Sequence, residues 1–233
     1  MGMPMGAGER PNRVQASVCR RAVVDALGEA AAEAVMRETG IDRLPESLPL
    51  GPRDLETLGR ELQPFVDLYR VVLARSDRET ALRVARYAIL ESGRVSHAGD
   101  ASAQRKAVTA GTTAAAGLNL TSPPPPGFQA SPEEIERQFD VGMSYFSCQG
   151  RLLAYTPDYV RFHITDCNWV RAMQRAGVPE LIPFFCETDE RFMDGHPTHR
   201  LVRPTAIGLG DDHCDFQYIP RSAKTPPQEG DKG

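Results

Sequence analysis

The sequence has no excess of positive charge and no long hydrophobic run. Its 233 residues include 27 Lys and Arg against 31 Asp and Glu, which gives a formal net charge of −4. Because phosphate recognition needs a concentrated positive field, we expect no nucleic-acid partner. No apolar stretch approaches the roughly 18 residues of a membrane span, and residues 1–13 lack the apolar core of a secretory signal. We therefore expect no membrane partner.

Paired cysteines and nucleotide-binding glycine motifs are also lacking. The five cysteines are an odd number, which fits a reduced cytoplasm better than a disulfide framework, so we expect a cytoplasmic protein. No two cysteines have the C-x₂₋₄-C spacing of structural zinc sites, and Pro197 disfavours a helical site at His196 and His199. With no Walker loop, G-x-G-x-x-G or G-x-S-x-G either, we expect no metal and no cofactor.

What the sequence does contain is enough apolar material for a core, since 41% of its residues are hydrophobic and 25% are charged. Residues 1–12 are predicted to be a mobile leader, and residues 13–93 a helical region. Apolar residues recur there at three- and four-residue steps, which indicates helices over 14–39, 54–74 and 77–93. Gly40 and Gly93 are the predicted stops, and Pro64 is expected to kink or divide the second helix.

Residues 94–130 break this pattern and are predicted to be a linker or long loop rich in Pro, Gly and Ala. The stretch ends in the tetraproline of residues 123–126. A tetraproline can serve as an extended spacer or as a ligand for a proline-binding partner, and the spacer needs no partner.

Residues 131–220 are predicted to form an α+β catalytic region, followed by a disordered tail over 221–233. Helices are expected over 131–141, 166–176 and 179–193, and strands over 145–155 and 159–164. A last hairpin pairs residues 201–207 with 213–219. The predicted fold class is α+β, with N-terminal helices followed by an antiparallel sheet packed with helices.

Three late cysteines occupy positions suited to chemistry. Cys186 and Asp189 are three residues apart on a predicted helix, so the carboxylate could take a proton from the thiol. The alternative is a packed thiol and a solvated carboxylate. Cys167 opens a helix, where free N–H groups favour a thiolate, although a small buried residue explains that position equally well. Cys214 is predicted to point inward with its strand, and Asp215 to face away.

Several short motifs in the second half of the chain occur in a recognisable order. They are Gly177-Val-Pro-Glu-Leu181, Phe185-Cys-Glu-Thr-Asp189, Arg203-Pro-Thr205, Gly210 and His213-Cys-Asp-Phe216. Over residues 130–220 this order resembles the L-2-amino-thiazoline-4-carboxylic acid hydrolase family. The resemblance implies a small cytoplasmic α+β enzyme that opens a thiazoline ring by hydrolysis to N-carbamoyl-L-cysteine.

The resemblance also implies roles for particular residues. The polar residues common to the pattern are Cys167, Cys186, Asp189, Cys214 and Asp215. A looser similarity to the Cys/Asp/Cys site of organomercurial lyase implies that Cys186, Asp189 and Cys214 act together. We therefore predict Cys186 as the nucleophile, Asp189 as the general acid/base and Cys214 as a second thiol. The predicted substrate-pocket residues are Cys167, Arg203, His213 and Asp215, with Arg203 stabilising developing charge.

The resulting hypothesis is a cofactor-independent hydrolase that opens or rearranges a small nitrogen- or sulfur-containing heterocycle. The family resemblance suggests a role in secondary metabolism, so the founding substrate is an analogy. The partner is a small-molecule substrate, and a homo-oligomer is compatible with this hypothesis. Two alternatives stay open: a module that binds or senses a small ligand or a thiophilic metal, and a scaffold whose late cysteines are core residues.

Overall fold

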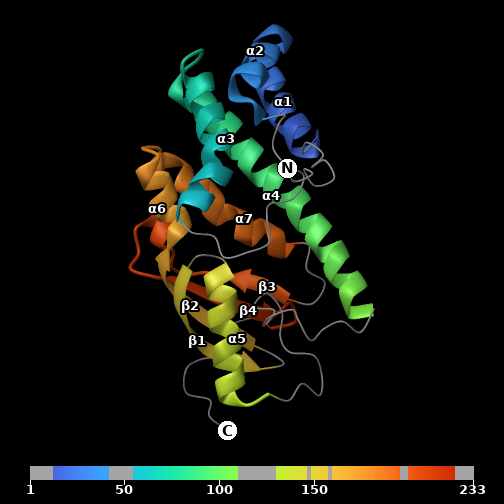
Figure 1. Cartoon of the computed structure of the whole chain (residues 1–233), viewed down its shortest axis with the longest axis vertical. Helices are drawn as coiled ribbons and strands as arrows, with labels where there is room; N and C mark the ends of the chain where they lie inside the picture. Colours follow the sequence, from blue (N-terminus) through green and yellow to red (C-terminus); the bar gives the residue numbers. More distant parts are fainter. Residues whose placement is uncertain are drawn as a thin grey trace, which may run out of the picture.

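The computed structural model describes residues 13–41, 55–109, 130–145, 148–156, 159–194 and 199–223. Helices α1 to α4 pack together with α6 and α7, and a four-stranded sheet with helix α5 lies below them in Figure 1. This arrangement confirms the predicted α+β class. The predicted leader, the tetraproline segment and residues 224–233 of the predicted tail lie outside the described residues.

The first predicted helix is in fact two helices, α1 (Arg13–Leu27) and α2 (Glu29–Thr39). The break falls at Gly28, whose φ of 86° is unfavourable for a residue with a side chain. Gly40 ends α2 as predicted, because it adopts the left-handed conformation and donates its N–H to the Met36 carbonyl.

The next two helices are longer and less interrupted than predicted. Helix α3 (Leu55–Leu73) continues through Pro64 as one helix. Helix α4 (Arg78–Thr109) passes through Gly93, so the predicted stop there is wrong, and residues 94–109 of the predicted linker are helical. Gly93 serves a close approach instead, because a Cβ there would lie 3.1 Å from Cγ2 of Thr188 on α7.

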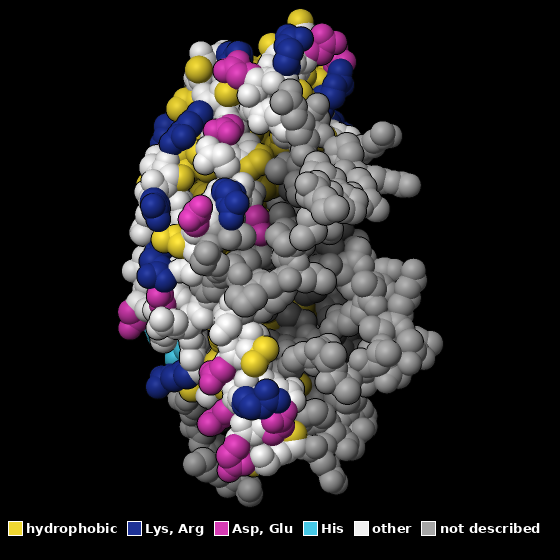
Figure 2. Space-filling view, in the orientation of Figure 1, with side chains coloured by type: hydrophobic (Ala, Val, Ile, Leu, Met, Phe, Trp, Pro, Cys, Tyr) yellow, Lys and Arg dark blue, Asp and Glu magenta, His cyan; other side chains and the backbone are white. Residues whose placement is uncertain are grey.

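The helices share a core to which α6 (Asn168–Arg175), the 3-10 turn η2 (Pro179–Leu181) and α7 (Ile182–Asp194) contribute. Cys19 of α1 is fully buried in this core. Among the described residues, no helix combines the length and the apolar character needed to cross a membrane. On the face in Figure 2, basic and acidic side chains are interspersed over the described surface.

The sheet is antiparallel and has the strand order β1-β2-β4-β3. Its strands are β1 (Cys148–Thr156), β2 (Tyr159–Cys167), β3 (His199–Val202) and β4 (Cys214–Pro220). Strand β3 ends well before residue 207, where the hairpin strand was predicted to end. After it, the chain makes the 3-10 turn η3 (Ile207–Leu209), which lies against α7.

Strand β4 is central and is buried on both faces. Cys214, Phe216 and Tyr218 join the core that helix α5 (Pro132–Tyr145) covers, which confirms their predicted inward orientation. Asp215 and Gln217 alternate with them and are also buried, at 4% and 7% exposure. The other sheet face therefore carries buried polar groups, which need partners of their own.

Candidate active site

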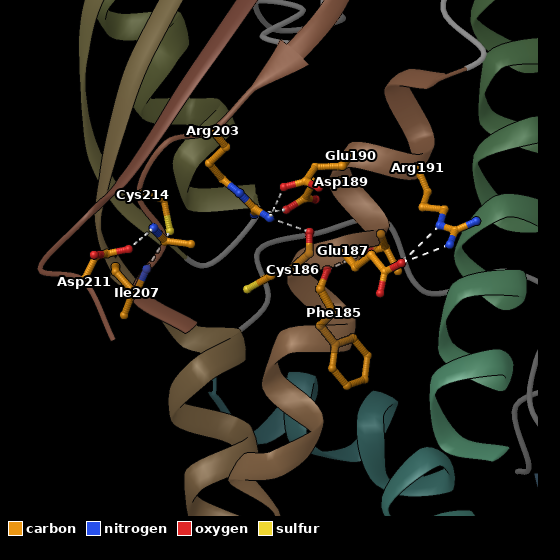
Figure 3. Close-up of polar contacts among 12 residues, drawn as sticks. Phe185, Cys186, Glu187, Asp189, Glu190, Arg191, Arg203, Ile207, Asp211 and Cys214 are labelled. Carbon is orange, nitrogen blue, oxygen red and sulfur yellow. Dashed lines mark hydrogen bonds and ion pairs between the residues drawn. The ribbon is translucent and has the colours of Figure 1, made fainter. Parts of the chain in front are cut away.

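Arg203 is the centre of the polar contacts between α7 and the sheet (Figure 3). Only 3% of its side chain is exposed. Its Nη1 donates to Asp189 Oδ2 at 3.0 Å, and its Nη2 donates to the Cys186 carbonyl at 2.8 Å and to Glu190 Oε1 at 3.1 Å. The guanidinium also lies 5.4 Å from the ring centroid of Phe216. These contacts compensate for burying the charge and fix the α7 carboxylates in place.

Asp189 is both accessible and perturbed. Its side chain keeps 44% of its surface exposed. Burial by the surrounding protein nevertheless raises the pKa of its carboxyl to about 6, against the lowering effect of Arg203. A carboxyl with that pKa exchanges a proton near neutral pH, which suits general acid/base chemistry.

Cys186 lies one helical turn before Asp189 on α7, as the three-residue spacing predicted. Its sulfur points away from the helix toward the segment that contains Ile207 and Cys214 (Figure 3). Burial raises the pKa of this thiol to about 12, although Arg203 acts in the opposite direction. Gly208 of η3 makes room for the sulfur, because a Cβ there would lie 2.5 Å from Cys186 Sγ and 2.6 Å from Ile182 Cγ2.

Replacing Gly208 with Ala is therefore expected to destabilise the protein by about 1–3 kcal/mol, because the new methyl group overpacks the contact between η3 and α7. Urea denaturation measures the change. Gly59→Ala in α3 is the matched control: a Cβ there meets no atom within 4 Å, so this change should be neutral or slightly stabilising. Equal midpoints for the two variants would contradict the packing of η3 against Cys186.

Cys214 enters the site from strand β4. Its thiol is buried and accepts the Ile207 N–H, with 3.3 Å between nitrogen and sulfur. Burial raises its pKa, although the Ile207 hydrogen bond acts to lower it. The N–H of Ala206, the residue before Ile207, donates to Asp211 Oδ2 at 2.7 Å (Figure 3). Two hydrogen bonds, one to the Cys214 thiol and one to the Asp211 carboxylate, therefore fix the turn before β4.

Cys167 lies at the junction of β2 and α6, close to the predicted helix start. It is the last residue of β2 and the N-cap of α6. Interaction with Cys148 lowers the pKa of Cys167, against the influence of burial.

The structure thus brings together three of the predicted residues and separates two. Arg203 hydrogen-bonds to both Asp189 and the Cys186 carbonyl, and Cys214 accepts the N–H of Ile207, the residue before the Gly208 that lies against the Cys186 sulfur. His213 and Asp215, predicted in the substrate pocket, lie elsewhere. The Asp215 carboxylate pairs with Arg161 at 3.0 Å on the sheet face opposite Cys214, and the His213 ring packs on His163 with 4.2 Å between centroids.

Sequence reasoning missed three contributors to the site. Cys148 was given no role, yet it lies opposite Cys167 in the sheet. Gly208 was given no role, and the signal that could have found it is its place in the turn before Cys214. Glu190 shares Arg203 with Asp189, and its position next to Asp189 in the sequence was the available signal.

No group of three or more His, Cys, Asp and Glu side chains in the described part of the chain is arranged to hold a metal ion. Arg203 nevertheless joins the Asp189 carboxylate to the residue that carries the Cys186 thiol, so a proton carrier, a cation and a thiol residue belong to one part of α7.

Comparison with known proteins places the chain among hydrolases that open small heterocycles. The profile of the family described as L-2-amino-thiazoline-4-carboxylic acid hydrolase matches residues 58–218, well over half of the chain. The chain belongs to this family. The match confirms the resemblance seen over residues 130–220 and extends it back to helix α3.

Other comparisons add little. No curated protein matches the chain. One solved structure that matches is a mutant form of an H-NOX protein from S. oneidensis in the Fe(II) ligation state. It has a TM-score of 0.32 and 12% identity over 92% of this chain and 98% of its own. At that TM-score the likeness carries no argument about fold or function.

Proposed function

We propose that the protein hydrolyses the ring of a small 2-amino-thiazoline carboxylate or a close relative, using Asp189 as general acid/base beside protein thiols. The observation that carries the proposal is the Asp189 carboxyl, accessible, with a pKa raised to about 6 and bound to buried Arg203, in a chain of this family. Family membership alone supports the reaction class, and this carboxyl supplies a group able to move the protons the reaction requires.

The chemistry needs two substitutions at the amidine carbon and two proton transfers, one to the leaving ring sulfur and one from the attacking water. A protein thiolate adds to the amidine carbon of the ring, the ring C–S bond breaks, and the leaving sulfur takes a proton from Asp189. A water molecule then gives its proton to the Asp189 carboxylate and attacks the same carbon. Expulsion of the protein thiolate leaves a urea and a substrate thiol, so the enzyme returns to its starting state.

Arg203 is suited to two tasks in this scheme. It holds Asp189 through the 3.0 Å hydrogen bond and thereby fixes the direction of proton transfer. As a buried cation, it also favours the negative charge that develops during addition. The predictions of Cys186 as nucleophile and Cys214 as second thiol remain open here. With a pKa of about 12, Cys186 would need Asp189 to remove its proton before attack.

The direct test is to incubate purified protein with L-2-amino-thiazoline-4-carboxylate and follow N-carbamoyl-L-cysteine by liquid chromatography and mass spectrometry. Wild type should form the product. Cys19→Ala should form it at a similar rate, because Cys19 lies in the helical core rather than in the site. Absence of ring opening by well-folded wild type would refute this substrate class.

A further inference from the structure

A row of polar side chains crosses the sheet on the face opposite the Cys214 core. Arg151 of β1, His163 of β2 and Asp215 of β4 are directly opposite one another in the strand register. Arg151 Nη2 lies 3.5 Å from His163 Nδ1, and His163 Nε2 lies 3.5 Å from Asp215 Oδ1. Only 12% of the His163 side chain is exposed. An ionisable ring is therefore largely buried in the middle of the sheet.

The two ends of this row determine where the ring carries its proton. A guanidinium can only donate hydrogen bonds, so His163 Nδ1 faces Arg151 with its lone pair. The proton of the neutral ring is then on Nε2, which faces the Asp215 carboxylate. At 3.5 Å this second contact is longer than a normal hydrogen bond, so the carboxylate compensates only weakly for the burial of the ring. The row therefore favours a neutral His163.

Cationic groups approach His163 from three directions. Arg151 faces it from β1, and Arg161 is two residues before it on the same face of β2. His213, from the segment before β4, packs its ring on that of His163 with 4.2 Å between centroids. Asp215 acts in the opposite direction, but its two oxygens already accept hydrogen bonds from Arg161. A second positive charge at His163 is therefore poorly accommodated.

The pKa of His163 follows from these surroundings. Burial lowers it below the ordinary value, and the neighbouring His213 adds to this effect. Asp215 opposes the shift, whereas Arg151 and Arg161 reinforce it. In the unfolded chain the histidine regains its ordinary pKa of about 6.5 and binds a proton more readily than in the folded protein. Protonation in mild acid thus favours unfolding.

The row lies directly behind the candidate active site. His213 and Asp215 flank Cys214 in the sequence, and Cys214 points to the opposite face of the sheet. Asp212, which is 90% exposed, pairs with His213. We propose that His163 is an acid-sensitive switch of the fold, neutral at neutral pH, whose protonation in mild acid weakens the β2–β4 pair that carries Cys214. This inference goes beyond the proposed function and does not depend on it.

The first test compares the urea denaturation of wild type and His163→Gln from about pH 7.5 down to about pH 5, above the ordinary pKa values of carboxyl groups. Glutamine stays neutral and can still accept from Arg151 and donate to Asp215. As the pH falls below about 6.5, the wild-type midpoint should fall relative to that of the variant. Asp189, whose pKa is raised to about 6, acts in the opposite direction in both proteins and cancels in the comparison. Midpoints that stay parallel would overturn the proposal.

The second test observes the ring itself, by NMR of protein labelled with ¹⁵N in its histidines. At pH 7 His163 should be neutral with its proton on Nε2, and it should titrate below the ordinary pKa of about 6.5. His213→Gln should move this titration to higher pH, because it removes a ring that can carry a like charge. If His163→Gln fails to fold, this titration decides the matter. A proton on Nδ1, a titration at or above pH 6.5, or an unchanged titration in His213→Gln would contradict the proposal.

Discussion

Replacing Asp189 with Asn is expected to lower kcat/KM for thiazoline ring opening by about 10²–10⁴-fold, the usual contribution of a general acid/base. The amide oxygen can still accept the Arg203 hydrogen bond, so the change removes the proton carrier and largely keeps the geometry. The measurement is product formation at saturating and subsaturating substrate, with circular dichroism to show that the variant is folded.

Glu190→Gln is the matched control. Glu190 is the neighbouring carboxylate on α7 and also binds Arg203, but 54% of its side chain is exposed. It should keep most of the turnover. Because the charge of Glu190 raises the pKa of Asp189, Glu190→Gln should also move the alkaline limb of the pH profile, where Asp189 loses the proton it must donate near pH 6, to lower pH. Equal losses in the two variants would mean that Asp189 serves only to hold Arg203.

Replacing Asp215 with Asn is expected to reduce the free energy of unfolding by about 3 kcal/mol, because it removes the charge that two hydrogen bonds pair with the largely buried Arg161. The side chains of Asp215 and Arg161 are only 6% and 18% exposed, and they form two hydrogen bonds, of 3.0 and 3.1 Å. Urea denaturation measures the loss. Asp212→Asn, at a 90% exposed neighbouring carboxylate, should leave the urea midpoint nearly unchanged.

The same carboxylate predicts how stability depends on pH. Burial acts to raise the pKa of Asp215, but the Arg161 and Gln217 hydrogen bonds outweigh it, so the folded-state pKa lies below the ordinary value. Such a group stabilises the fold above its unfolded pKa of about 3.9, and the contribution is lost as the pH falls through the folded pKa. The difference in the free energy of unfolding between wild type and Asp215→Asn should therefore shrink at acidic pH. A constant difference down to low pH would contradict this role.

Periodicity was sufficient to predict the parts of the site that lie within single elements. The three-residue step from Cys186 to Asp189 holds in α7, and the alternation of β4 correctly turns Cys214 inward and Asp215 away from it. These are local geometric consequences of helix and strand, and no long-range contact can alter them once the element forms.

Glycines were harder to interpret, because one residue type serves two purposes. Gly40 ends a helix through its positive φ, whereas Gly93 continues one and admits Thr188 of a distant helix. Thr188, the residue that Gly93 meets, lies far along the chain, so no pattern in the sequence around Gly93 indicates this contact. The predicted stop was wrong for that reason, and the length of α4 was underestimated with it.

The Cys148–Cys167 pair was within reach of the sequence. Thr156 pairs with Tyr159, so the strands are joined by two residues, and counting outward from that turn places 148 opposite 167. The irregularities of register between these points cancel by the time the strands reach the two cysteines. What the sequence lacked was a clear start for β1. Because the sequence does not show clearly where β1 begins, it does not indicate that Cys148 lies in a strand opposite Cys167.

The source of the oxygen in the ring-opened product is the most direct test of hydrolysis at the amidine carbon. The measurement is a reaction of wild type with L-2-amino-thiazoline-4-carboxylate in ¹⁸O-labelled water, with the product analysed by mass spectrometry. Hydrolysis at the amidine carbon predicts N-carbamoyl-L-cysteine labelled in its ureido oxygen, formed by wild type and reduced to a trace in Asp189→Asn. An intact ring, an unlabelled product, or equal rates in wild type and Asp189→Asn would contradict it.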